Sequence, residues 1–172
     1  MADPTAEAPA QALEEWWQLS APASSLSEGE RLHTSIEGRF VTIFRHKGSL
    51  SAIDSICHHA GGPLTAGPLQ EIEDLGVSVV LCPWHRFAVD IRLGLKVYQS
   101  VEIQNGAPVP TGWRIGKMVQ RSHTVIERTE EDSLFVKLVV DASEPCSSDK
   151  DASSARCAQS LDIVGVSGPH AL

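Results

Sequence analysis

The chain is organised around two short segments, which read CHHAGGPL at residues 57–64 and CPWH at residues 82–85. Four side chains in them are suited to bind a soft or borderline metal: Cys57, His59, Cys82 and His85. Within each segment the cysteine and histidine are two or three positions apart, so both can reach one small object. The glycines and prolines beside them allow the backbone to bend around it.

Two kinds of centre match such a donor set. One is a tetrahedral zinc site with two cysteines and two histidines. The other is a [2Fe–2S] cluster with both cysteines on one iron and both histidines on the other. Zinc-binding loops usually pair like ligands, whereas each segment here offers one of each kind. The pattern therefore favours the cluster over zinc.

Together the two segments resemble the Rieske motif, in particular that of small soluble Rieske iron–sulfur domain-containing proteins. A weaker similarity runs through VTIFRHK, LKVYQS and RSHTV and spans roughly residues 30–140. The resemblance implies an all-β fold of antiparallel sheets with a small two-loop cluster-binding subdomain. It also implies one [2Fe–2S] cluster per chain. Cys57 and Cys82 would bind the buried iron, and His59 and His85 the outer one.

Some positions depart from the Rieske pattern. Arg86 stands where a glycine usually follows the second histidine, and the 22 residues between His59 and Cys82 suggest a longer surface loop at 70–78. Trp84 replaces the cysteine that would form a disulfide between the loops, and residues 86–89 contain no hydroxyl. These features predict a potential at the low end of the range of about −150 to +300 mV that Rieske centres span.

Outside the two segments the pattern is that of short strands with glycine and proline between them. Two hairpins are expected, across Glu37-Gly38-Arg39 and across His46-Lys47-Gly48. Further strand candidates, after a first one at Trp16–Leu19, are Val77–Leu81, Ala88–Ile91, Val97–Val101, His123–Arg128 and Leu134–Val140. The proline-rich stretch 105–110 is either a loop over the cluster or a linker.

Composition divides the chain into three parts. We expect a disordered N-terminal segment at 1–14, a Rieske domain at 15–141 with cluster-binding loops at about 56–68 and 82–87, and a disordered Ser-, Ala- and Asp-rich tail at 142–172. Cys146 and Cys157 fall in the tail and have no expected role. His58, next to two predicted ligands, is expected to be an exposed side chain.

The net charge of −8 arises from the ends, because residues 31–140 carry twelve bases and eleven acids. Nothing is basic enough to indicate a nucleic-acid partner, and no apolar stretch is long enough to span a membrane. The first residues do not form a signal peptide. We therefore expect a cytoplasmic location.

These features favour a soluble one-electron carrier over an enzyme. Such a protein would pass electrons from a reductase to an oxygenase or another acceptor, so its partners would be a redox donor and a redox acceptor. One alternative is a non-catalytic subunit of a larger redox enzyme. The other is a zinc-stabilised interaction module without redox activity.

Overall fold

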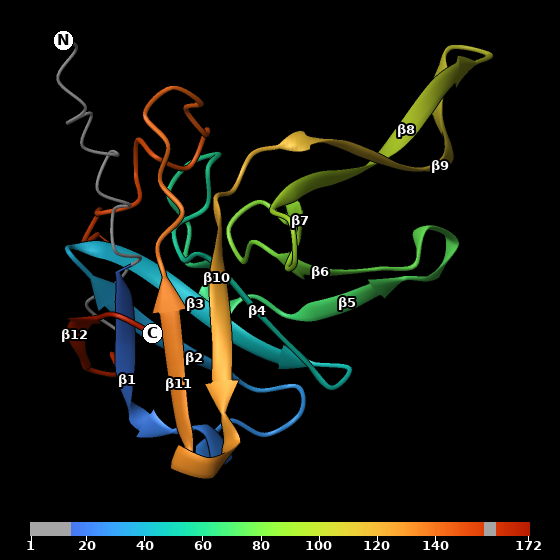
Figure 1. The fold of residues 1–172 in the computed structure, drawn as a ribbon. Coiled ribbons are helices and arrows are strands. Elements are labelled where there is room, and N and C mark those ends of the chain that lie inside the picture. Colours follow the sequence, from blue (N-terminus) through green and yellow to red (C-terminus); the bar gives the residue numbers. More distant parts are fainter. Residues whose placement is uncertain (1–14, 157–160) are drawn as a thin grey trace, which may run out of the picture.

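The computed structural model describes residues 15–156 and 161–172. Within these ranges the chain forms two antiparallel sheets and four short 3-10 turns (Figure 1). The larger sheet has the order β12-β1-β11-β10-β4-β3-β2 and the smaller one β5-β6-β7-β8-β9. The expected all-β class is confirmed.

The larger sheet contains seven strands: β1 (Trp16–Pro22), β2 (Arg31–Ile36), β3 (Arg39–His46), β4 (Ser49–Asp54), β10 (Ser122–Arg128), β11 (Ser133–Lys137) and β12 (Val166–His170). The smaller sheet contains five: β5 (Leu69–Ile72), β6 (Val77–Leu81), β7 (Ala88–Asp90), β8 (Leu95–Gln104) and β9 (Ala107–Met118). The 3-10 turns are η1 (Ala23–Ser25), η2 (Leu64–Ala66), η3 (Glu73–Leu75) and η4 (Thr129–Glu131).

Two-residue turns fix the register of three hairpins. Glu37-Gly38 joins β2 to β3, Lys47-Gly48 joins β3 to β4, and Asn105-Gly106 joins β8 to β9. All six of these residues have positive φ, which is the conformation that a type I′ hairpin turn requires. The first two hairpins were predicted from the sequence, and both are confirmed.

The buried side chains form two main clusters. One fills the larger sheet and includes Ile36, Val41, Ile43, Leu134 and Val136. The other joins both sheets to the two cysteine-containing segments. It combines Cys57 and Cys82 with the apolar side chains of Phe44, Ile53, Leu64, Val80, Val89 and Ile91. Burial of each large apolar side chain is worth about 1.5–3 kcal/mol, so this second cluster anchors both segments to the body of the protein.

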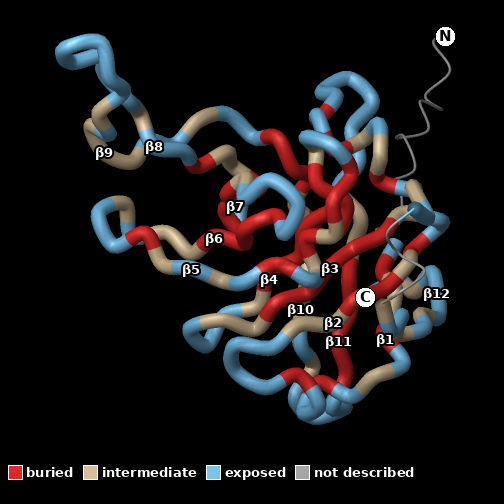
Figure 2. Tube along the Cα trace, turned by 180° about the vertical axis from the view of Figure 1, so that it is seen from behind, coloured by how far each residue is buried: buried red, intermediate tan, exposed pale blue. Residues whose placement is uncertain are grey.

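Two hairpins of the smaller sheet project away from the body (Figures 1 and 2). Residues 69–81 form one of them, from β5 through η3 to β6, where a surface loop was expected at 70–78. Strands β8 and β9 form the other. The proline-rich stretch 105–110 forms the turn of this hairpin and the beginning of β9. It is therefore neither a linker nor a loop that lies over the cysteine-containing segments.

The described parts of the tail, residues 142–156 and 161–172, differ from the disordered segment expected at 142–172. Strand β12 pairs with β1, and Ser148 and Ala152 are buried. The cause is a set of polar contacts that composition does not reveal. Asp149 pairs with Arg39 and Arg121, which come from distant parts of the chain. Residues 1–14, where disorder was expected, lie outside the described residues, and so does Cys157.

No helix in the described parts of the chain is long and apolar enough to cross a membrane.

Candidate metal centre

The two cysteine-containing loops share one backbone plan. Cys57 donates its N–H to the carbonyl of Gly62 at 2.8 Å, and Cys82 does the same to Phe87 at 2.8 Å. Each cysteine carbonyl accepts a hydrogen bond from the backbone N–H four residues later in the chain. The donor to Cys57 is Gly61 at 2.9 Å, and the donor to Cys82 is Arg86 at 2.7 Å. Each loop is therefore a tight turn that closes on its own cysteine, despite the different sequences.

The two cysteines meet in the interior. Cys57 has no exposed surface and Cys82 is 2 % exposed, and their side chains are hydrogen-bonded to one another. This bond and burial raise the pKa of Cys57, whereas the same bond lowers the pKa of Cys82 to about 6.

Backbone N–H groups surround both sulfurs. Those of His59 and Ala60 point to the sulfur of Cys57, and those of Trp84 and His85 to that of Cys82. Such donors stabilise negative charge on sulfur, which both a metal-bound thiolate and an iron–sulfur cluster require.

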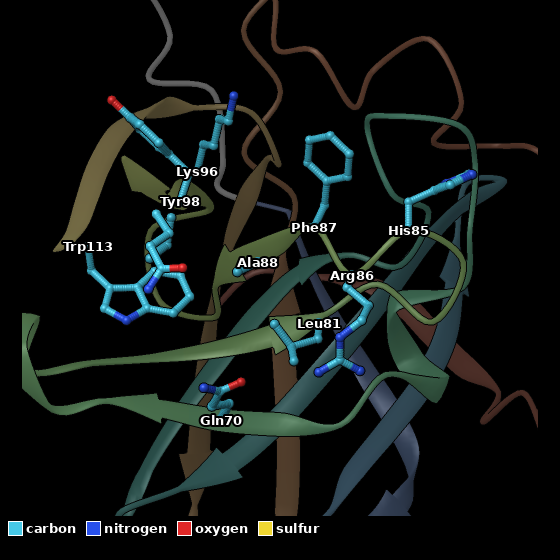
Figure 3. A pocket seen from close by; sticks show the side chains of 11 residues that line it. Gln70, Leu81, His85, Arg86, Phe87, Ala88, Lys96, Tyr98 and Trp113 are labelled. Atoms are coloured by element: carbon cyan, nitrogen blue, oxygen red, sulfur yellow. The ribbon is translucent and has the colours of Figure 1, made fainter. Parts of the chain in front are cut away.

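The two histidines lie outside the cysteines. Both are exposed, and their rings lie edge to face with centroids 4.8 Å apart. Phe87 stacks on the ring of His59 at 4.2 Å. Figure 3 shows His85 and Phe87 on the same loop, with His85 directed outward. The loops thus present a buried pair of sulfurs beneath an exposed pair of imidazoles.

Gly62 sets how closely the loops approach. A Cβ at this position would lie 2.6 Å from the sulfur of Cys82 and 3.1 Å from the ring of Trp84. No real side chain could occupy that space. The two glycines of the first segment therefore have different roles. Gly61 adopts a positive φ, and Gly62 leaves space for the sulfur of Cys82 and the ring of Trp84.

The four predicted donors form two pairs, cysteine with cysteine and histidine with histidine. Among the described residues, no group of three or more His, Cys, Asp or Glu side chains gathers closely enough to hold one metal ion. An inner sulfur pair and an outer nitrogen pair is the arrangement that fits a two-iron cluster. The residues present therefore fit the group that the sequence pattern indicates.

Gln120 supports the first loop and had no sequence signal. Its buried side-chain amide donates to the carbonyls of Asp54 at 2.9 Å and Ile56 at 2.6 Å. Its side-chain oxygen accepts from the N–H of His58 at 3.1 Å. One glutamine therefore satisfies three backbone groups that flank Cys57.

Asp54, buried at the end of β4, forms the centre of a polar network. Arg39 donates to it at 2.6 Å, His123 contacts it at 3.0 Å, and Ser148 of the tail donates to it as well. Burial acts to raise the pKa of Asp54, but the hydrogen bonds from His123 and Arg39 outweigh it and hold the pKa below its usual range. This network ties the tail to the strand that leads into Cys57.

The remaining histidines serve packing. His33 stacks on Phe40 and bonds to Ser55, His46 bonds to Glu71, and His123 belongs to the Asp54 network. His58 is half-buried rather than fully exposed, with its ring edge against Phe87.

Comparison with known proteins identifies the family of the chain. The family of soluble Rieske-type ferredoxins matches residues 23–140. A human Rieske domain-containing protein is 32 % identical over 126 residues, covering 73 % of this chain and 75 % of that protein. The ferredoxin component of the naphthalene 1,2-dioxygenase system of Pseudomonas putida is 26 % identical over 78 residues, 45 % of this chain and 69 % of that protein.

Known structures show the same fold. The terminal oxygenase of carbazole 1,9a-dioxygenase from Novosphingobium sp. KA1 superposes with a TM-score of 0.53 at 19 % identity. The match covers 77 % of this chain but only 31 % of the oxygenase chain, so the likeness is to one part of that enzyme. Rieske-type proteins normally bind a [2Fe–2S] cluster and generally act as electron-transfer components. This chain belongs to the family of soluble Rieske-type ferredoxins.

Proposed function

We propose that the protein is a one-electron carrier whose [2Fe–2S] cluster is held by Cys57, His59, Cys82 and His85. The observation that carries the proposal is the buried cysteine pair capped by the exposed histidine pair, built on two loops with the same backbone plan. When bound, the cluster would supply a centre that accepts and releases one electron.

The surrounding residues would hold the cluster and keep water from its inner half. The apolar cluster of Phe44, Leu64 and Val80 lies beneath the cysteines. Phe87 covers one face of His59, and Trp84, which is 46 % exposed, lies over Gly62. The histidine side is exposed, so electrons would enter and leave there.

The partners we propose are a reductase as donor and an oxygenase or a similar enzyme as acceptor. Support comes from the naphthalene dioxygenase ferredoxin component, which by name belongs to such a system. The four donors are the one metal-binding pattern that the sequence offers, which favours a carrier over an enzyme with its own substrate site. A cytoplasmic location is part of the proposal, and it is supported by the match of residues 23–140 to the soluble Rieske-type ferredoxins.

Metal analysis combined with a redox titration tests this function. The proposal predicts about two irons and two sulfides per chain and a reversible one-electron transition. Its midpoint should lie below about +100 mV, in the lower part of the Rieske range, because no disulfide links the loops and no hydroxyl follows His85. A protein that contains zinc and shows no transition would support an interaction module instead.

A further inference from the structure

A groove begins beside His85. It encloses a cavity of about 530 Å³ between the β5–β6 and β8–β9 hairpins. The residues that line the cavity include Arg86, Phe87, Ala88, Lys96, Tyr98 and Trp113. Figure 3 shows Trp113 at one end of the groove and Arg86 and His85 at the other. The groove therefore leads from the projecting hairpin to a candidate outer ligand.

The chain that builds this region is basic. Residues 82–118 contain five Lys or Arg and two Asp or Glu, a net charge of +3, while the rest of the chain has a net charge of −11. One of the two acids, Asp90, is buried and accepts the N–H groups of Arg92 and Leu93, so it adds little to the surface. Two of the five bases, Arg86 and Lys96, line the groove that begins at His85, so positive charge lies beside this histidine of an otherwise acidic protein.

The bases in this region also lack acidic partners. In the described parts of the chain, no carboxylate pairs with any of them: Arg86, Arg92, Lys96, Arg114 and Lys117. Several bases elsewhere are paired with acids, as Arg39 and Arg121 are with Asp149, and Lys47 with Glu71. The positive charge of the groove and hairpin is therefore not cancelled within the molecule.

Apolar side chains on the same hairpin are uncovered. Val101 is 56 % exposed, Ile103 70 % and Ile115 44 %, and the hairpin extends away from the body (Figure 2). Isolated exposed apolar residues are ordinary, but three of them on one hairpin that also carries unpaired bases are typical of a protein-binding surface.

We propose that the groove and the β8–β9 hairpin bind the acidic surface of a redox partner protein, so that the partner docks against His85. The proposal rests on the electron-carrier function above and adds the chemistry of the partner. Carboxylates of the partner would face Arg86, Lys96 and Arg114, and its apolar side chains would pack on the hairpin. Because the remaining surface is strongly acidic, repulsion would disfavour every other orientation. An extended polyanion such as nucleic acid would meet the same repulsion.

The first test measures the local charge at the electron-transfer site. The reduced holoprotein is oxidised in a stopped-flow instrument by hexacyanoferrate(III), an anion, and by tris(bipyridine)cobalt(III), a cation. We expect the rate constant with the anion to fall as salt is added, against the sign of the protein's net charge. The double variant Lys96→Glu/Arg114→Glu should lower that rate constant by about tenfold.

The double variant Lys47→Glu/Arg128→Glu is the matched control, because it changes the net charge equally at sites on other hairpins. It should leave the rate constant with the anion within about twofold of the wild type. A rate constant that rises with salt and ignores the Lys96→Glu/Arg114→Glu change would overturn the proposal. If the electron-carrier function itself were wrong, neither oxidant would react and no visible absorption would be present.

The second test maps the binding surface without electron transfer. The holoprotein is treated with a carbodiimide and an eight-residue peptide of alternating glutamate and leucine, and the coupled lysines are identified by mass spectrometry. We expect coupling at Lys96 and Lys117 in preference to Lys47, Lys137 and Lys150, and a severalfold lower yield in Ile103→Ser. Coupling spread evenly over the five lysines, or unchanged by Ile103→Ser, would contradict an acidic and apolar partner at this surface.

Discussion

Gly61 and Arg86 occupy the same position in the two cysteine-containing loops. Each is the fourth residue after a cysteine and donates its N–H to that cysteine's carbonyl, and each has positive φ, 80° and 58°. Glycine adopts this conformation freely, whereas another residue bears a cost of about 1–2 kcal/mol. The second loop therefore keeps the geometry of the first at the expense of backbone strain at Arg86.

Replacing Arg86 with glycine should relieve this strain. We expect Arg86→Gly to raise the free energy of unfolding by up to about 1 kcal/mol, measured by urea denaturation. Arg86→Asn is the matched control, since asparagine tolerates positive φ and also removes the charge. A loss of stability in Arg86→Gly would mean that the guanidinium makes a contact worth more than the strain.

The β-hairpins were predictable because their signals are local. Glu37-Gly38 and Lys47-Gly48 each place a glycine at the second turn position between two strand-forming runs, and the structure forms both turns. The four candidate ligands were visible for the same reason, as short spacings around glycine and proline. Strand β9 was missed because two prolines and one glycine in its first half, Pro108, Pro110 and Gly112, obscure the strand pattern.

Long-range polar contacts left no such signal. Asp149 meets Arg39 across 110 residues, and Gln120 bonds to backbone groups more than sixty positions away. No periodicity or spacing in the sequence indicates such pairs. The contacts of Asp149 in the tail, and those of Gln120 with the loop that carries Cys57, are therefore known only from the structure. Composition alone predicted disorder around Asp149, where ion pairs with Arg39 and Arg121 attach the tail to the larger sheet.

Gly62 should be indispensable for cluster binding. A methyl group at this position would displace the sulfur of Cys82, so Gly62→Ala should lose most of its iron while the strands remain intact. Iron content and far-UV circular dichroism measure the two effects. Gly116→Ala is the control, because its Cβ would meet Tyr98 at an ordinary 3.5 Å. Full iron content in Gly62→Ala would show that the loops can separate without loss of the site.

Gln120 should stabilise the loop that carries Cys57 and His59. Gln120→Leu keeps the volume but leaves three buried backbone groups without partners. At about 1–3 kcal/mol for each unsatisfied group, reduced by partial relaxation, we expect a loss of about 2–4 kcal/mol. Urea denaturation measures it, and visible absorption should bleach faster on storage. Gln99→Leu is the control, since Gln99 is exposed; equal losses in both variants would refute the role.

Asp149 should make stability depend on pH. Hydrogen bonds from Arg121 and Arg39 hold the pKa of Asp149 well below its usual range, although burial opposes them. A depressed pKa means that the ionised carboxylate stabilises the fold above about pH 4, the unfolded value, and that this contribution fades as the pH falls further. The melting temperature of the metal-free chain should therefore be lower in Asp149→Asn at pH 7, with the difference narrowing below pH 4. A difference that stays constant down to pH 3 would show that the carboxylate's charge is not the cause.

If two cysteines and two histidines share one cluster, pulsed EPR of the dithionite-reduced protein should detect both imidazoles. We expect one unpaired electron per cluster, coupled to nitrogen nuclei of two imidazoles, with one coupling lost in His59→Cys and one in His85→Cys. A colourless protein without an EPR signal, or a signal without nitrogen coupling, would contradict it.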